Sequence, residues 1–519
     1  MNRPNLLYIH TDQHTPFVTG CYGDPLVRTP NLDRLAAGGA VFDQVYCASP
    51  ICVPSRMSML TARQPHHNRV WTNSHILDSA IPTHAHAMGA AGYQPILVGR
   101  MHSVGPDQLH GYARRLVGDH SPNHIGSRAS VDRGILDGTS GPHRMSLIKS
   151  GPGLSGYQVH DEVVTAAAVN VLNELGVQKR INGQLDPFSL TVGFMLPHAP
   201  FAARRAQYDY YRERMTLPKK NHAFAETTHP YLRAWRTYTV LEEPTPDEMV
   251  LRARAAYWGM VEAFDAMIGQ ILDALHANGL AENTLIVYTS DHGDMVGEHG
   301  LWWKHVFYEE SVRVPLIMHW PAAIAAGQRC ERPINAVDVA ATMLDALGAP
   351  TLPNSDGRSF LGLVSDLRPT PSWADVAFSE YCADEYTPGG SPAERQPQGD
   401  EPHTCFQRMV RQNIDGTAWK LIYYHNDEPQ LFNLSDDPDE LHDLAQSPAH
   451  QAVRQQLTAR VLEGWDPAEI AQIMAAKRAE NKVLAAWARN TNPAESYRWD
   501  LRPEMNRLED FDPNGLSER

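Results

Sequence analysis

A cysteine, a proline and an arginine stand in a CxPxR arrangement within the string ICVPSRMSMLTAR, residues 51–63. Pro54 suits the first turn of a helix, and no helix-breaking residue follows it in this string. The unpaired N–H groups of a helix start attract anions, and Arg56 would add a positive charge. Cys52 is therefore placed where a nucleophile could meet a bound anion, although free cysteine is also among the most frequently buried residue types.

Two short apolar runs, NLLYIH and TLIVYT, are each followed by a pair of side chains that can bind a metal ion. These pairs are Asp12 with Gln13 and Asp291 with His292. Such runs are typical of buried parallel strands, and open α/β sheets bind ligands at the carboxyl ends of their strands. The two pairs could hold a divalent cation that polarises a bound anion. A capped turn after a strand would also account for the DHG string that begins at Asp291.

The CVPSR string, with Thr61, Ala62 and Arg63 behind it, resembles the signature of the sulfatase family, in which a TGR-like end follows CxPSR. The resemblance implies an alkaline-phosphatase-like fold and the conversion of Cys52 to formylglycine by a formylglycine-generating enzyme. A hydrated aldehyde carries two hydroxyl groups on one carbon. One can attack sulfur, and deprotonation of the other then expels sulfate and restores the aldehyde. A thiolate would form an adduct without this release route.

Further strings resemble the anion-binding elements of the family. GRMH matches a GK(W/M)H element, with Arg100 in place of the usual lysine, and PHAP matches PHxP. A guanidinium offers a planar fork where lysine is a point charge. Carried over from the resemblance, the expected catalytic residues are Cys52, Arg56, His102, His198 and Lys304, the expected substrate-binding residues are Arg100 and Asn73, and the expected metal ligands are Asp12, Gln13, modified Cys52, Asp291 and His292.

The resemblance also suggests roles for these residues. Imidazole titrates near neutrality, so His102 is assigned to the deprotonation of the hydrate and His198 or Lys304 to the protonation of the leaving group. Asn73 is expected to contact substrate, although a turn or cap residue would fit the same position. One divalent cation, Ca²⁺ or Mn²⁺, is expected. His292 resembles the phosphonate monoester hydrolase and choline sulfatase branches, and an imidazole ligand suits manganese better than calcium.

The strings around the nucleophile and GRMH resemble choline sulfatases in particular. A quaternary ammonium group needs an aromatic pocket, yet Tyr157 is the only Phe, Tyr or Trp between Val117 and Val159. We therefore expect a different small alkyl or aryl sulfate monoester. A phosphonate monoester or phosphodiester hydrolase, or an enzyme that cleaves both ester types, is the alternative. An inactive binding protein is disfavoured because every catalytic position keeps a competent residue type.

Composition limits the possible partners and compartments. The net charge of −15 argues against a nucleic-acid surface, and no apolar stretch approaches the roughly 20 residues of a membrane span. The six cysteines show no CxxC pair, which favours a reducing compartment. Met1 lies close to the first predicted strand and leaves no room for a signal peptide. We expect a cytoplasmic enzyme with a small, soluble, anionic substrate.

Alternating α and β elements predict a large, mostly parallel sheet sandwiched by helices. The expected parts are a catalytic domain at residues 1–368, a smaller α+β subdomain with an antiparallel sheet at 369–479, and a tail at 480–519. A long helix is predicted over residues 246–278, with a capping box at its start. The tail carries Trp487, Tyr497 and Trp499, which could dock on the chain's own domain or on a neighbouring subunit, and we expect a homo-oligomer.

Overall fold

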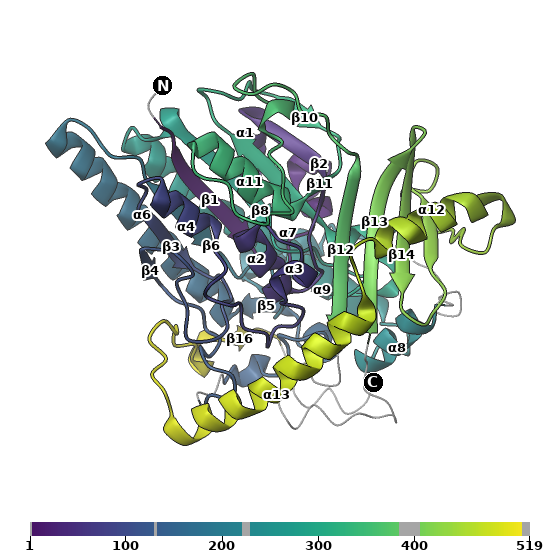
Figure 1. The fold of residues 1–519 in the computed structure, drawn as a ribbon. Helices are drawn as coiled ribbons and strands as arrows, with labels where there is room; N and C mark the ends of the chain where they lie inside the picture. Colours follow the sequence, from purple (N-terminus) through teal and green to yellow (C-terminus); the bar gives the residue numbers. More distant parts are fainter. Residues whose placement is uncertain (1–2, 129–131, 221–228, 384–404, 511–519) are drawn as a thin grey trace.

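The computed structural model describes residues 3–128, 132–220, 229–383 and 405–510, and its centre is a nine-stranded sheet (Figure 1). The strand order is β10-β2-β9-β8-β1-β6-β3-β4, and β11 pairs with β2. β9 runs antiparallel to both β2 and β8, while the other pairs are parallel. The prediction of a large, mostly parallel sheet is confirmed. The strands are β1 (Asn5–Thr11), β2 (Ala40–Tyr46), β3 (Pro95–Gly99), β4 (Arg114–Leu116), β6 (Ser189–Gly193), β8 (Thr284–Ser290), β9 (Arg313–His319), β10 (Gln328–Cys330) and β11 (Ile334–Asn335).

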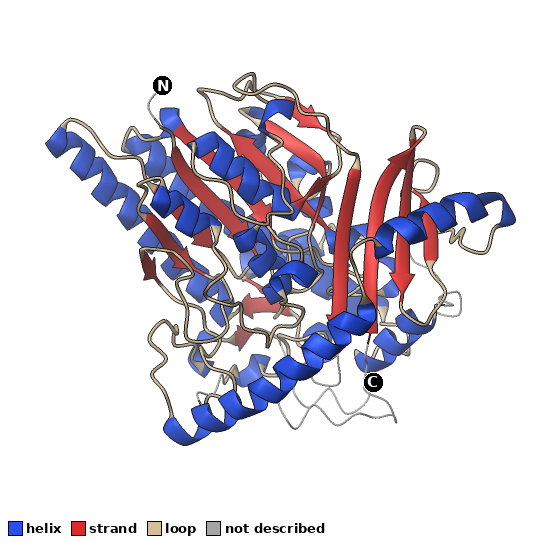
Figure 2. Ribbon diagram, in the orientation of Figure 1, coloured by secondary structure: helices blue, strands red, loops and turns tan. Residues whose placement is uncertain are grey.

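Helices cover both faces of this sheet (Figure 2). Successive strand residues point to opposite faces, so Leu6 and Tyr8 of β1 join one apolar cluster and Leu7 and Ile9 the other. The cluster with Leu6 includes residues of α2 (Cys52–Thr61), α4 (His84–Ala90) and α11 (Ala336–Leu347). The cluster with Leu7 includes residues of α1 (Pro30–Ala37), α6 (Gly156–Asn182), α7 (Arg205–Arg212) and α9 (Asp247–Ala277).

The long helix α9 confirms the predicted apolar stripe but begins differently from the prediction. Its six predicted core residues, Tyr257, Val261, Phe264, Ile268, Leu272 and Leu275, are all buried. Pro246 is the N-cap residue, with φ −55° and ψ 139°, and no side chain caps the helix. The predicted capping box was therefore wrong. The acidic Asp247 and Glu248 occupy the first turn instead, where they interact favourably with the helix dipole.

A second, four-stranded antiparallel sheet follows the catalytic fold. Its strands are β12 (Val376–Ala383), β13 (Cys405–Ile414), β14 (Thr417–Tyr424) and β15 (Gln430–Asn433), and α12 (Gln451–Leu462) packs on it. Tyr381, Met409 and Tyr424 of this sheet belong to the same apolar cluster as the main sheet's Leu6 and Tyr8. The small sheet thus shares a core with the large one.

The C-terminal segment lies against the catalytic fold. Helix α13 (Pro467–Thr491) is continuous across the boundary predicted at residue 480 (Figure 1). After it, the ring of Trp499 packs 5.1 Å from that of His160 on α6. β16 (Arg507–Leu508) then pairs with β5 (Gly151–Leu154). Of the two docking modes considered for the tail, contact with its own chain is present, and contact with a neighbouring subunit stays a prediction.

The remaining described α-helices and strands are short and connect the larger elements. They are α3 (Pro65–Asn68), α5 (Met145–Ile148), α8 (Pro230–Tyr238), α10 (Glu309–Val312) and β7 (Ala202–Ala203). Among the helices in the described ranges, none combines the length and the apolar character that crossing a bilayer requires.

Candidate active site and metal centre

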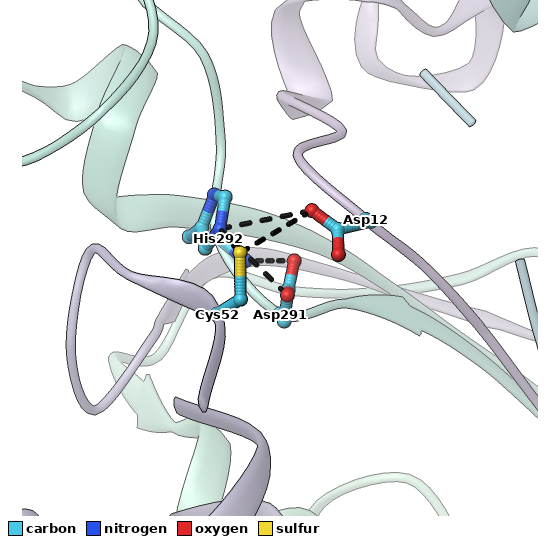
Figure 3. Close-up of side chains that lie close together, drawn as sticks. All are labelled: Asp12, Cys52, Asp291 and His292. Carbon is cyan, nitrogen blue, oxygen red and sulfur yellow. Dashed lines mark hydrogen bonds and ion pairs between the residues drawn. The ribbon is translucent and has the colours of Figure 1, made fainter. Parts of the chain in front are cut away.

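Four side chains that can bind a metal ion meet where β1, β8 and α2 come together (Figure 3). Since β1 and β8 are parallel neighbours, Asp12 and the pair Asp291 and His292 leave the sheet at the same edge. Cys52 is the first residue of α2. Its Sγ lies 3.7 Å from Asp12 Oδ1 and 3.3 Å from His292 Nε2. Donor atoms of the four residues all lie within 4.8 Å of one another.

This cluster fits a divalent cation. All four side chains are buried, and two of them are carboxylates, which are costly to bury close together unless positive charge compensates them. Nδ1 of His292 donates to the carbonyl oxygen of Gly293 at 3.0 Å, which leaves Nε2 as the metal-binding atom. Burial lowers the pKa of His292 to about 4, so its ring is neutral at pH 7, as a metal ligand must be.

Gln13 lies beside the cluster, and its amide is bound by protein groups. The Oε1 atom accepts a hydrogen bond from Lys304 Nζ at 2.7 Å, and Nε2 donates to Asp294. Its backbone N–H donates to Asp291 Oδ1 at 3.0 Å, so Gln13 also orients one of the carboxylates. The direct binding of a metal ion by Gln13 stays a prediction.

Arg56 pairs with one carboxylate at the end of β1 and one at the end of β8. It is 1% exposed, and its Nε and Nη2 lie 2.8 Å from Asp291 Oδ2 and 3.0 Å from Asp12 Oδ2. Nη1 lies 2.9 Å from His10 Nδ1. Because Nε, Nη1 and Nη2 each have a protein partner, Arg56 holds the two carboxylates in place for a metal ion. In this arrangement it positions the site instead of meeting the substrate.

Arg100 directly follows β3, where its backbone lies very close to that of Gly193 at the end of β6. The backbone N–H of Arg100 donates to Gly193 at 2.9 Å, and a Cβ on Gly193 would lie 1.8 Å from the carbonyl oxygen of Arg100. A glycine is therefore required at the end of β6. The guanidinium then meets three partners, which are Asp12 at 2.6 Å, Asp119 at 3.0 Å and His102 at 2.9 Å.

Together with burial, the charge of Arg100 shifts the pKa values of its neighbours Asp12 and His102. Burial alone would raise the pKa of Asp12, but the charges of Arg100 and Arg56 contribute to holding it well below its usual range. Burial, followed by the charge of Arg100, holds the pKa of His102 well below its usual value. Arg100 donates to Nδ1 of His102, so the neutral ring carries its proton on Nε2. Because Arg100 occupies the lone pair of Nδ1, His102 can accept a proton only after this hydrogen bond breaks.

Replacing Arg100 by lysine is expected to lower kcat/KM for the best ester by about 10- to 100-fold, because an ammonium cannot hold Asp12, Asp119 and His102 together. Steady-state kinetics of Arg100→Lys would measure this. Arg408→Lys is the matched control, since Arg408 is also buried but lies in the C-terminal sheet. Unchanged kinetics for Arg100→Lys would show that the guanidinium fork has no role.

His198 and Lys304 also lie close to Cys52. Lys304 Nζ lies 3.2 Å from Cys52 Sγ. Nδ1 of His198 donates to the carbonyl oxygen of Ala199 at 2.6 Å, so the lone pair of the neutral ring is on Nε2. Burial, with a further contribution from Lys304, lowers the pKa of His198. Both residues predicted to serve the leaving group thus stand near the nucleophile position.

Asn73 acts as a cap in this structure. Its Oδ1 accepts a hydrogen bond from the backbone N–H of Val53 at 2.9 Å, which satisfies one of the free N–H groups at the start of α2. The cap alternative considered for Asn73 is therefore present, and a substrate contact stays a prediction.

Three residues of the site were not found from the sequence, namely His10, Asp119 and Asp294. Asp119 follows the edge strand β4, whose sequence RRL lacks the apolar run on which the strand-end argument for Asp12 depended. His10 lies within the apolar run that forms β1 and was not considered separately. Asp294 lies three residues after Asp291, and burial raises its pKa to about 6.

Comparisons with known proteins identify the family. The family model described as Sulfatase matches residues 4–349. A choline-sulfatase of Rhizobium meliloti is 30% identical over 99% of this chain and 96% of its own length. An N-acetylglucosamine-6-O-sulfatase of Bacteroides thetaiotaomicron is 27% identical over 89% of this chain and 86% of its own length.

The fold has solved counterparts. The crystal structure of a phosphonate monoester hydrolase of Agrobacterium radiobacter superposes with a TM-score of 0.70, at 23% identity, over 92% of this chain and 96% of that chain. The family match and the choline-sulfatase relative confirm the resemblance stated for the CVPSR string, and the solved structure confirms the predicted fold class. The chain belongs to the sulfatase family and is a hydrolase of sulfuric esters.

Proposed function

We propose that this enzyme cleaves a small organic sulfate monoester, with a formylglycine hydrate made from Cys52 as the nucleophile. The observation that carries the proposal is the place of Cys52. Its Sγ lies 3.7 Å from Asp12 Oδ1 and 3.3 Å from His292 Nε2, which are candidate metal ligands, and 3.2 Å from Lys304 Nζ. The thiol stands where the hydrate's hydroxyl groups would be after conversion by a formylglycine-generating enzyme.

A divalent cation bound by Asp12, Asp291, His292 and modified Cys52 would supply Lewis-acid polarisation of the anion and the nucleophile. The imidazole of His292 favours Mn²⁺ over Ca²⁺ among the two expected ions. The protein's own cations would complete the anion site. Arg100 and Lys304 face the same region as Cys52 and would hold the oxygens on which negative charge develops in the transition state.

The reaction proceeds in two stages. One hydroxyl group of the hydrate gives its proton to Nε2 of His198 as its oxygen bonds to sulfur and the ester S–O bond breaks. The leaving alkoxide then takes a proton from Lys304 or from the protonated His198. His102, once released from Arg100, removes the proton of the second hydroxyl. The C–O bond to sulfate then breaks, sulfate leaves as the dianion and the aldehyde re-forms. Addition of water to the aldehyde restores the hydrate.

Hydrolysis of phosphonate monoesters or phosphodiesters is the second candidate, and His292 is the observation that favours it. An imidazole in the cluster, with Nε2 at 3.3 Å from Cys52 Sγ, suits the metals that also serve phosphoryl transfer. Both transition states place negative charge on peripheral oxygens, so the same donors could serve both ester types.

A substrate panel distinguishes the two candidates. We expect the fully converted enzyme with Mn²⁺ to show its highest kcat/KM on a sulfate monoester, with phosphonate monoesters and phosphodiesters matched in leaving group as the comparison. A phosphonate or phosphodiester rate far above every sulfate rate would overturn the proposal. The R. meliloti relative named choline-sulfatase makes choline sulfate a necessary member of the panel.

A further inference from the structure

Three side chains, Tyr157, His120 and Arg133, form a cluster next to His198. The ring centroid of Tyr157 lies 5.9 Å from that of His198, and Cζ of Arg133 lies 5.9 Å from the Tyr157 ring centroid. Tyr157 is 4% exposed and His120 is 5% exposed. From Cys52, the successive neighbouring side chains are therefore His198, Tyr157 and Arg133.

The hydrogen bonds within the cluster have a defined direction. His120 Nδ1 donates to Asp119 Oδ1 at 3.0 Å, so its Nε2 is an acceptor. The Tyr157 hydroxyl and Arg133 Nη2 lie 3.2 Å and 3.1 Å from that Nε2. Burial lowers the pKa of His120 to about 4, in agreement with a neutral acceptor. The imidazole that Arg133 contacts is therefore neutral at pH 7.

Arg133 differs in this respect from the two other arginines of the site. Arg56 and Arg100 are each paired with two carboxylates. Within the part of the chain that the structure describes, Arg133 pairs with no carboxylate, and its Nε is buried without a hydrogen-bond partner. A partly buried guanidinium with free donors is costly to maintain and is well shaped to bind an anion.

We propose that Arg133 binds a second anionic group, carried by the leaving group of the ester. The inference rests on the proposed function, which places the leaving group beside His198. A carboxylate and a second sulfate share the chemistry that a guanidinium recognises. A quaternary ammonium at the same place would meet a like charge. Choline sulfate is therefore expected to be a poor substrate.

The test uses esters that differ only in the charge of the leaving group. They are 3-sulfooxypropanoate, its primary amide, the bis-sulfate of ethylene glycol and choline sulfate. For the wild-type enzyme we expect kcat/KM to be about 10- to 100-fold higher for the carboxylate than for the amide. The bis-sulfate shows whether a second sulfate replaces the carboxylate. Arg133→Gln should remove the preference and leave the amide within about threefold of wild type. Arg128→Gln, an exposed arginine of the preceding segment, should preserve the preference.

Two results would overturn the inference. One is equal kcat/KM for the carboxylate and the amide in the wild-type enzyme. The other is an equal loss on both esters in Arg133→Gln, which would show that Arg133 only supports His120 and Tyr157. If no sulfate ester is cleaved, the proposed function fails separately. The same leaving groups carried on methylphosphonate esters then still measure the charge preference, whose presence supports the anionic subsite and whose absence refutes it.

Discussion

Cys52→Ala is expected to lower kcat for the best sulfate ester by on the order of 10⁴-fold or more, because removing a nucleophile removes the covalent route altogether. The protein should stay folded. Cys52 is 1% exposed, and the loss of one buried sulfur costs about 1 kcal/mol. The measurement is steady-state kinetics beside far-UV circular dichroism and urea unfolding of the same preparation.

Cys47→Ala is the matched control for this variant. Cys47 is also fully buried, five positions before Cys52, and its Sγ lies 3.9 Å from Ser379 Oγ, in the core shared by the two sheets. It should lose a similar amount of stability and keep its turnover. A merely modest loss of kcat in Cys52→Ala, comparable with that of Cys47→Ala, would contradict the nucleophilic role.

Arg56→Met is expected to abolish turnover and to lower the free energy of unfolding of the metal-free protein by about 3–5 kcal/mol. The reason is electrostatic. Arg56 lies 3.0 Å from Asp12 and 2.8 Å from Asp291, and all three side chains are at most 1% exposed. Methionine fills much of the space but removes the arginine partner of Asp291 and leaves Asp12 with Arg100 alone as its arginine partner. Urea unfolding in the presence of a chelator measures the loss.

The same experiment in the presence of Mn²⁺ tests the metal cluster. A divalent cation bound by Asp12 and Asp291 would replace part of the missing charge, so the stability difference from wild type should shrink when the metal is added. Arg34→Met is the control, because Arg34 and Asp273 form an exposed pair at 3.6 Å that should contribute no more than about 1 kcal/mol. An Arg56→Met protein as stable as Arg34→Met in chelator would refute the account of Arg56.

The sequence predicted the main residues of the site better than it predicted the residues that pair with them. Asp12 and Asp291 could be located because each follows an unbroken apolar run, and runs of that kind form adjacent buried strands. Asp119 could not be located as easily. It follows Arg114–Leu116, a three-residue edge strand with two charged residues, which carries no apolar pattern.

The role of Arg56 shows what spacing alone does not determine. Four residues after a cysteine at a helix start, an arginine is as well placed to bind a substrate anion as to bind protein carboxylates. The structure shows the second arrangement, with the guanidinium held by Asp12, Asp291 and His10. Those partners come from two strands distant in sequence, so only the fold could reveal the pairing.

Boundaries were harder to predict than elements. The apolar stripe of α9 was evident from its helical period, but its first residue was not, because Pro246 fits both an N-cap and a first-turn position. The predicted tail boundary at residue 480 lies inside α13, which is continuous from Pro467 to Thr491. Nothing in the local sequence there, such as a glycine or proline, indicates a break.

The central claim is that the nucleophile is formylglycine at position 52, and peptide mass spectrometry of the active enzyme tests it most directly. Preparations with different degrees of conversion would be digested, and the fraction of the Cys52 peptide that carries an aldehyde would be compared with kcat on the best sulfate ester. We expect kcat to rise in proportion to that fraction and to extrapolate to zero for the unconverted thiol. A fully active preparation in which Cys52 remains an unmodified cysteine would contradict the account.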